Sequence, residues 1–235
     1  MRTWLKLMIS LVALSGCASP SIMLSYPESS NPSGSRADDA SENAVIGLFR
    51  FEDLRGLDPD VAGKRRSLIT MELPITRRVD LKADKDVQRF LVEALEVELR
   101  NRGFPVRSDG VYERVIEIEA FSEELVRLEV RADRVLLGRI HYLAWVEPGF
   151  AGAAVQPFMP SGKAYVDLDI VIIDPQSLEI LWAGQAFRKV DSGVRAPLLP
   201  AERGEHLTHA LSGAFESLFD LSDFRSALTG TLARH

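Results

Sequence analysis

The most regular hydrophobic pattern of the chain lies between Asp84 and Gly103. Apolar residues recur every three or four positions from Val87 to Leu99, and charged residues occupy the opposite face. Asp84 is a suitable N-cap, and Gly103 is typical of the position just after a helix. The pattern therefore predicts an amphipathic helix over residues 85–102.

A second ladder of the same spacing appears near the C-terminus. Apolar residues follow one another at helical intervals from Leu207 to Phe219. Pro200 is well placed to begin this helix, and Ser222-Asp223 can cap a short terminal turn after it. We expect a second amphipathic helix here.

Apolar runs and strict alternation predict strands elsewhere. Residues 44–51 form a compact apolar run, and Arg134 to Val146 reads as a long strand with Gly138 in its interior. Residues 164–173 and 178–190 predict a hairpin, joined by a turn over Asp174-Pro175-Gln176-Ser177 with proline at its favoured second position. Further strands are expected at 67–73, 104–107 and 111–121, residues 122–132 fit either a helix or a strand, and Glu52 to Gly56 should turn away from the first strand.

These elements define one fold class. Two amphipathic helices and five to seven strands predict an α+β domain over residues 43–230, with a mostly antiparallel or mixed sheet and both helices packed on one face. The chain of 235 residues allows this single domain, preceded by an N-terminal segment of different character.

The N-terminal segment has the pattern of an export signal. Positive charges at Arg2 and Lys6 come with an apolar run of about ten residues, which is too short to cross a bilayer as a helix. The run ends in Leu14-Ser15-Gly16-Cys17, which resembles the lipobox of bacterial lipoproteins at all four positions. That resemblance implies cleavage between Gly16 and Cys17, with fatty acids such as palmitate on Cys17.

Lipidation would anchor the protein to a membrane without a spanning helix, because two or more acyl chains bind a bilayer stably. The alternative is an unmodified thiol behind an ordinary signal peptide. Cys17 is the single cysteine, so no disulfide within the chain is possible. Ala18 follows Cys17. By resemblance to lipoprotein sorting in enterobacteria, a residue other than aspartate directly after the lipidated cysteine implies the periplasmic face of the outer membrane. The inner membrane is the alternative.

Composition separates the lipidated cysteine from the domain. Residues 17–42 are rich in Ser, Pro, Asn, Gly and Asp, so we interpret them as a disordered tether reaching roughly 80 Å when extended. Without residues 1–16 the chain has 26 basic (28 minus 2) and 34 acidic residues, a net charge of −8. Such a charge disfavours nucleic acid and anionic headgroups as partners.

Four segments together resemble YajG-like bacterial lipoproteins and, more distantly, the N-terminal domain of TolB. The segments are Val45–Arg55, Glu98–Val106, Ala132–Ile140, and the hairpin around Asp174 that ends in Leu181-Trp182. These are patterns of fold, and the resemblance brings no catalytic residue. It implies an accessory role in the envelope, such as binding a partner protein or assisting a transport or surface-assembly machine.

No catalytic, phosphate-binding or dinucleotide motif is present, and we expect neither enzyme activity nor a cofactor. Asp167 and Asp169 could be paired carboxylates, with His141 as a further candidate, although alternating acids usually mark a solvated strand face. His206 and His209, near Glu202 and Glu205, share a helix face but lack a third ligand for a metal.

The apolar segment 150–160 is the best candidate for a partner contact. Its contact candidates are Phe150, Val155, Phe158 and Met159, which lie among prolines and glycines; alternatively the segment covers the sheet edge. The sequence thus favours a non-enzymatic, membrane-anchored binding module. The alternative functions are an auxiliary lipoprotein of a transporter, with a lipid or small ligand between helices and sheet, and a hydrolase using Asp167, Asp169 or His141.

Overall fold

The computed structural model describes most of the predicted domain and one residue of the preceding segment. The described residues are 26, 44–55, 76–80, 87–148, 161–193 and 198–230. The predicted signal peptide, most of the predicted tether, the N-cap Asp84, the predicted strand 67–73 and segment 150–160 lie outside these residues.

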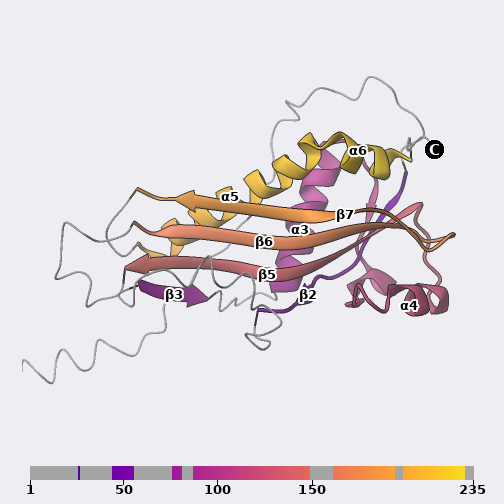
Figure 1. Ribbon diagram of the computed structural model, residues 1–235, viewed down its shortest axis with the longest axis horizontal. Coiled ribbons are helices and arrows are strands. Elements are labelled where there is room, and N and C mark those ends of the chain that lie inside the picture. The colour runs from indigo at the N-terminus through magenta and orange to yellow at the C-terminus, as the bar shows by residue number, and fades with distance from the viewer. Residues whose placement is uncertain are drawn as a thin grey trace, which may run out of the picture.

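The domain is built on a seven-stranded mixed sheet with β5 at its centre. Along the main path the strands follow the order β4-β1-β5-β6-β7, and β2 and β3 also pair with β5 (Figure 1). Strand β1 pairs in parallel with β4 and β5, and β2 pairs in parallel with β5. The pairs β3–β5, β5–β6 and β6–β7 are antiparallel. The strands are β1 (Ile46–Leu48), β2 (Glu52–Asp53), β3 (Thr76–Asp80), β4 (Val106–Arg107), β5 (Arg134–Pro148), β6 (Lys163–Asp174) and β7 (Glu179–Asp191).

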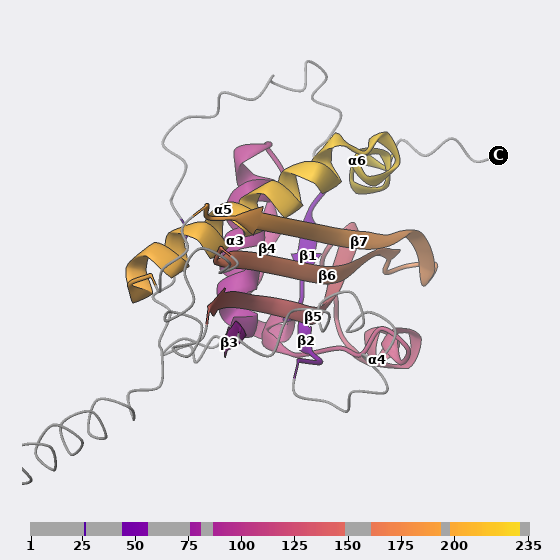
Figure 2. The same cartoon turned by 60° about the vertical axis from the view of Figure 1, so that its left-hand side comes forward.

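Three helices cover one face of this sheet. They are α3 (Val87–Asn101), α5 (Pro200–Asp220) and α6 (Ser222–Thr229). In Figures 1 and 2, α3 crosses behind the long strands, and α5 runs beside β7 into α6. The predicted fold class is confirmed: the domain is α+β, with a mixed sheet and both predicted amphipathic helices on one face.

The main core lies between these helices and the sheet. Leu91 and Leu95 of α3, Trp145 of β5, Leu168 of β6 and Phe215 of α5 are all fully buried there. Apolar side chains at helical spacing thus meet apolar side chains at strand spacing, which is the arrangement the hydrophobic pattern predicted.

Gly138 explains how the first strand region fits against β5. A Cβ atom built on Gly138 would lie 2.2 Å from Cε1 of Phe51, which is fully buried. Only glycine leaves room for this ring at the centre of β5.

The opposite face carries two smaller clusters, and the larger of these lies under a short helical segment. The 3-10 helix η1 (Gly110–Glu113) and helix α4 (Phe121–Arg127) place Tyr112 and Leu125 against Phe49 and neighbouring strand residues. The prediction of a half-exposed strand over 111–121 is wrong. Ile116 is fully buried, as the alternation suggests. In this segment, however, only Val115 forms a β-bridge, and its partner is Arg50. The segment therefore covers a core without forming a strand of the sheet.

The beginning of the domain differs from prediction in two further ways. Within the predicted strand 44–51, only β1 has regular pairing. Glu52 and Asp53 form strand β2, which pairs with β5, although a turn away from the sheet was predicted there. Strand β3, over residues 76–80, was not predicted at all. Its sequence, TRRVD, is mostly polar, and its pairing with the end of β5 is a long-range contact that local pattern does not encode.

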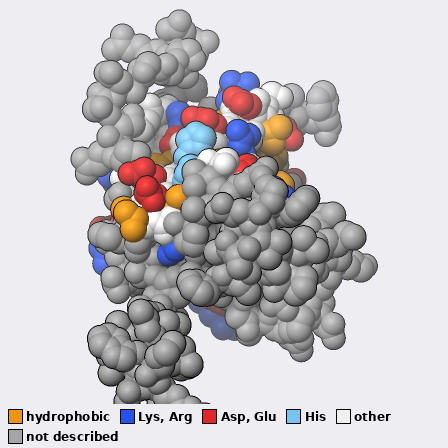
Figure 3. Space-filling view, turned by 90° about the vertical axis from the view of Figure 1, so that its left-hand side faces the viewer, with side chains coloured by type: hydrophobic (Ala, Val, Ile, Leu, Met, Phe, Trp, Pro, Cys, Tyr) orange, Lys and Arg blue, Asp and Glu red, His pale blue; other side chains and the backbone are white. Residues whose placement is uncertain are grey.

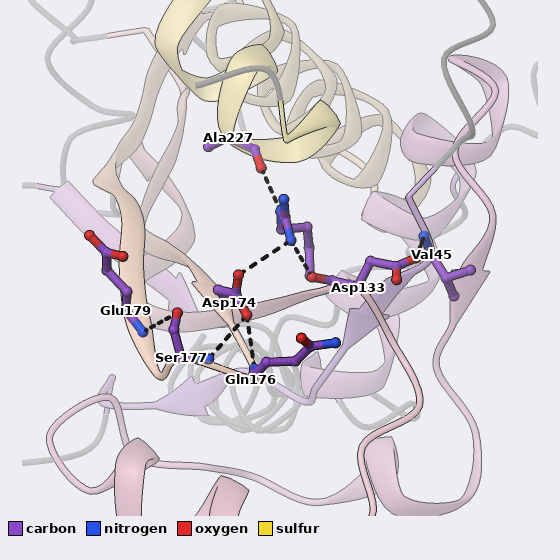
Figure 4. A network of polar contacts seen from close by, with 8 residues as sticks. Val45, Asp133, Asp174, Gln176, Ser177, Glu179 and Ala227 are labelled. Atoms are coloured by element: carbon purple, nitrogen blue, oxygen red, sulfur yellow. Dashed lines mark hydrogen bonds and ion pairs between the residues drawn. The ribbon is translucent and has the colours of Figure 1, made fainter. Parts of the chain in front are cut away.

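The predicted hairpin is confirmed, but the hydrogen bond that closes its turn joins residues four apart, where a type I turn would join residues three apart. The N–H of Leu178 donates to the carbonyl oxygen of Asp174 at 2.8 Å, and Leu178 adopts φ +60°, which leucine rarely does. The Asp174 carboxylate accepts backbone N–H bonds from Gln176 at 2.8 Å and Ser177 at 3.3 Å (Figure 4). These bonds hold the turn in place.

Arg134 and Asp133 tie this turn to the rest of the domain. The Arg134 guanidinium lies 3.7 Å from the Asp174 carboxylate and donates to the carbonyl oxygen of Ala227 near the end of α6 (Figure 4). The Asp133 carboxylate accepts the Val45 N–H at 2.7 Å. Asp133-Arg134, which belongs to one of the segments resembling known lipoproteins, therefore has a structural role.

Candidate functional site

Polar side chains cross the face of the sheet that lies opposite α3 and α5. The strand register aligns Glu52 of β2 with Arg139 of β5, Arg139 with Asp169 of β6, and Asp169 with Gln185 of β7. We call these residues, together with His141 and Asp167, the polar row. It brings together His141, Asp167 and Asp169, the three acid/base candidates of the sequence.

Most members of the polar row pair with one another. Arg139 Nε lies 2.6 Å from a carboxylate oxygen of Glu52, and the same guanidinium contacts Glu119. Nε2 of His141 lies 2.6 Å from Oδ2 of Asp169. His141 reaches this position because the register of β5 and β6 shifts between Ile140 and Tyr142. A β-bulge often re-aims a side chain in this way.

Asp167 is the most buried acid of the row, with 5% of its surface exposed. Its Oδ1 accepts a hydrogen bond from the Gln185 side-chain amide. A carboxylate at this depth requires such partners, because burying it without them would cost several kcal/mol. Asp167 and Gln185 therefore form a second polar pair beside His141 and Asp169.

Apolar clusters flank the polar row on both sides. One is the small core under η1 and α4, and the other contains Tyr142, Ala144, Val146 and Tyr165. The rings of Tyr142 and Tyr165 meet edge to face at 5.8 Å, and the Lys189 ammonium lies 5.0 Å from the centre of the Tyr165 ring. The row is thus a polar interruption in an otherwise apolar strand surface.

The geometry of the row fits structural pairing better than acid/base catalysis. A hydrolytic triad needs a hydroxyl or thiol in contact with the imidazole whose other nitrogen meets the carboxylate. In the described part of the chain, Nε2 of His141 contacts the Asp169 carboxylate, and the Asp167 carboxylate accepts a hydrogen bond from the Gln185 amide. These pairings give the hydrolase hypothesis no support.

The two histidines of α5 do not come together with other ligands. The His206 ring stacks on Trp145 at 5.5 Å, and His209 is exposed. Figure 3 views the end of the domain where β5 and β7 terminate and α5 begins; histidine side chains there lie among acidic and basic ones. In the described ranges no three potential ligands gather closely enough to hold a metal ion.

Strand β7 forms the outer edge of the sheet, and no described residue pairs with its outer side (Figure 1). From Ile180 to Phe187 it carries no charged residue, and the Phe187 side chain is 51% exposed. Edge strands are usually protected by charges, prolines or bulges. Here a register shift at Leu181 and the charges of Arg188 and Lys189 protect the two ends only.

The space between helices and sheet is filled by the protein itself. Leu95, Trp145, Leu168 and Phe215 are all fully buried and belong to one continuous cluster. A ligand in this position would have to displace core side chains. The carrier hypothesis, which expected its ligand there, gains no support from this packing.

Several predicted site residues lie outside the described residues: Gly16, Cys17, Phe150, Val155, Phe158 and Met159. Lipidation of Cys17 and partner contact through segment 150–160 remain predictions. None of the helices in the described part of the chain has the length and hydropathy needed to cross a bilayer.

The architecture is that of a small α+β domain with helices on one face of a mixed sheet. Solved structures to which the chain is similar include lipoprotein GNA1162 from Neisseria meningitidis, at 16% identity and TM-score 0.35, covering 76% of this chain and 99% of that one. A Xanthomonas campestris protein of family DUF330 has 11% identity and TM-score 0.46, covering 91% and 96%. The LpoB C-terminal domain from Salmonella enterica has 11% identity and TM-score 0.23, covering 66% and 89%. No protein-family model and no curated protein matches the chain.

Proposed function

We propose that this protein is a lipid-anchored accessory module of the bacterial envelope that binds a partner protein and catalyses no reaction. The lipobox-like segment ending at Cys17 supports the anchor, and the polar row, with its members paired to one another, supports a role without catalysis. The proposed location is the periplasmic face of the outer membrane. A specific kinship with YajG-like lipoproteins remains part of the proposal.

The observation that carries the binding function is the outer edge of β7, with which none of the described strands pairs. An extended segment of a partner can add to such an edge, with main-chain hydrogen bonds giving affinity and side chains giving specificity. Residues after the bulge at Leu181 are in regular register with β6 up to Asp191, so they offer a continuous template. The proposed occupant is an extended strand of an envelope protein.

Phe187 is the natural probe of this edge. A photo-crosslinking residue at position 187 of the native lipoprotein should capture one envelope protein in cells, and mass spectrometry should map the crosslink to an extended segment. The matched control is position 126, where Val126 is 71% exposed on α4, a helix outside the sheet. Equal capture at both positions, or none at 187, would contradict docking at β7.

Charge on the edge provides the second test. Ala183 and Phe187 are both exposed, so the double substitution Ala183→Lys/Phe187→Lys should leave the fold intact and abolish the specific crosslink, because lysines block strand addition. Val126→Lys should leave the crosslink unchanged. A crosslink to a second copy of the chain would show that this edge forms a homodimer and does not bind another envelope protein.

The anchor is tested separately. Cys17→Ser should release the protein from the membrane fraction, and the mass of the membrane-extracted native protein should include the acyl chains. A native protein of unmodified mass would contradict lipidation. Deletion of residues 150–160 then shows whether this segment adds a second contact, since the deletion should weaken capture through position 187 if it does.

A further inference from the structure

One residue of the predicted tether, Tyr26, lies on the helical face of the domain. Its hydroxyl donates a hydrogen bond to Oε1 of Glu98 on α3 at 2.5 Å, and its ring meets the Phe90 ring edge to face at 6.5 Å. Ser212 of α5 interacts with the same hydroxyl. The side chain is half-buried and packs against the main core. Tyr26 therefore contacts α3 and α5, two of the three helices that cover this face of the sheet.

The receptor for this tyrosine is held in place by the two helices. Glu98 forms an ion pair with Arg102, one turn later on α3. The Arg102 guanidinium in turn lies 4.0 Å from the centre of the Phe219 ring on α5. Burial, followed by the hydrogen bond to Glu98, raises the pKa of Tyr26 well above its ordinary value. The tyrosine thus occupies a formed site.

We propose that Tyr26 is a docking point that fixes the N-terminal segment to the α3–α5 face and thereby orients the anchored domain on the membrane. This inference rests on the proposed lipid anchor at Cys17. With Tyr26 docked, only nine residues (26 minus 17) separate the anchor from the domain surface. Fully extended, they reach about 30 Å.

The size of the domain makes this length decisive. A domain of about 190 residues has a radius of gyration near 16 Å, which corresponds to a sphere of about 21 Å radius and about 65 Å around half its circumference. A segment of about 30 Å cannot pass round such a body. The helical face must therefore turn toward the bilayer, and the polar row must turn away from it. An undocked tether reaching roughly 80 Å would allow every orientation.

The single cysteine makes docking measurable. Spin labels at Cys17 and at an introduced Glu216→Cys, an exposed position of α5, report the distance between segment and helical face in the full chain, produced without acylation in mild detergent. A flexible segment of nine residues has a root-mean-square span of about 17 Å, whereas the 28 residues from Cys17 to Val45 span about 29 Å. Docking should give a short, narrow distribution, and Tyr26→Ala should lengthen and broaden it.

Two variants of α3 separate docking from general effects. Glu98→Ala removes the acceptor of the tyrosine hydroxyl and should broaden the distribution. Glu93→Ala, which removes an exposed ion pair with Arg89 on the same helix, should not. A wild-type distribution that is already broad, or one that Tyr26→Ala leaves unchanged, would overturn the proposal. Since the protein is not acylated, this outcome is independent of whether Cys17 carries lipid.

Orientation is tested on the lipidated protein in vesicles. A fluorophore on Glu216→Cys should transfer energy to acceptor-labelled headgroups more efficiently than one on Val126→Cys, because α4 lies on the opposite face of the sheet. Tyr26→Ala should equalise the two efficiencies. Equal efficiencies in the protein with Tyr26 intact would show that docking does not orient the domain.

Discussion

The two faces of strand β6 differ although they belong to the same twelve residues. Toward the helices, every second residue from Ala164 to Ile172 is apolar and fully buried. Toward the other face, Tyr165 and Ile173 are apolar, but Asp167 and Asp169 stand between them. The helical face is thus continuous with one core, whereas the other face has two small cores separated by the polar row. This difference indicates that stability depends mainly on the helical face, and it leaves the other face more tolerant of change.

The comparison predicts its largest effect at Trp145. Trp145→Ala removes the largest fully buried side chain, together with its stacking on His206, and should lower the free energy of unfolding by about 3–5 kcal/mol. Urea denaturation followed by circular dichroism measures this loss. The matched substitution on the edge, Phe187→Ala, should cost less than about 1 kcal/mol. Similar losses for both variants would refute the asymmetry between the faces.

Gly138 tests the closeness of packing on the helical face. Gly138→Ala forces a methyl group against the Phe51 ring and should cost about 1–3 kcal/mol. Gly213→Ala is the control: its new methyl group would lie 3.2 Å from the movable end of the Arg188 side chain, and alanine favours the helix by about 1 kcal/mol. We expect this variant to be neutral or more stable in the same denaturation experiment. Loss at Gly213 comparable to that at Gly138 would contradict the packing argument.

Periodicity predicted the helical face well, because both amphipathic helices and the long strands bury a continuous apolar stripe. It failed where burial and pairing separate. The alternation from Val115 to Glu119 has the period of a strand, but Ile116 fills the small core from a segment that forms only one bridge. Periodicity missed strand β3 for the opposite reason, because this polar segment joins the sheet through a long-range pairing with β5.

The candidate site could be predicted only in part. The sequence placed Asp167 and Asp169 on one strand face, but their alternation alone could not show that Gln185 and His141 would meet them. His141 needed a β-bulge to reach Asp169, and a bulge in this strand has no local signal. The docking of Tyr26 was missed because the composition around it is typical of a disordered segment, and one aromatic residue does not change that average.

Arg139 provides a test of the polar row. Arg139→Met keeps most of the side-chain volume but leaves Glu52 without its ion pair in a half-buried position, so we expect a loss of about 1–2 kcal/mol in unfolding free energy. The control is Arg127→Met on α4, where the ion pair with Glu123 is almost fully exposed and should contribute less than about 0.5 kcal/mol. An Arg139→Met variant as stable as the control would show that the row contributes little to folding.

The smallest effect on global stability is expected at Tyr26, and it depends on pH. Because burial and the Glu98 carboxylate raise the pKa of Tyr26, the docked state favours the neutral phenol. The contribution of the neutral phenol to docking should be fully present below about pH 10, the ordinary pKa of tyrosine, and should decline as the pH rises from there toward the raised pKa of the docked side chain. The spin-label distance between Cys17 and position 216 should therefore lengthen reversibly in alkaline solution.

The control is Tyr26→Phe, whose ring cannot ionise. Docking of this variant should be weaker at neutral pH because the hydrogen bond to Glu98 is lost. It should not change between pH 8 and about pH 11 while the fold is intact. Equal lengthening in both proteins would assign the effect to loosening of the helical face and would leave ionisation of Tyr26 without a role. A change confined to the native tyrosine would show that the segment before the domain is bound by the same helical layer that forms the core.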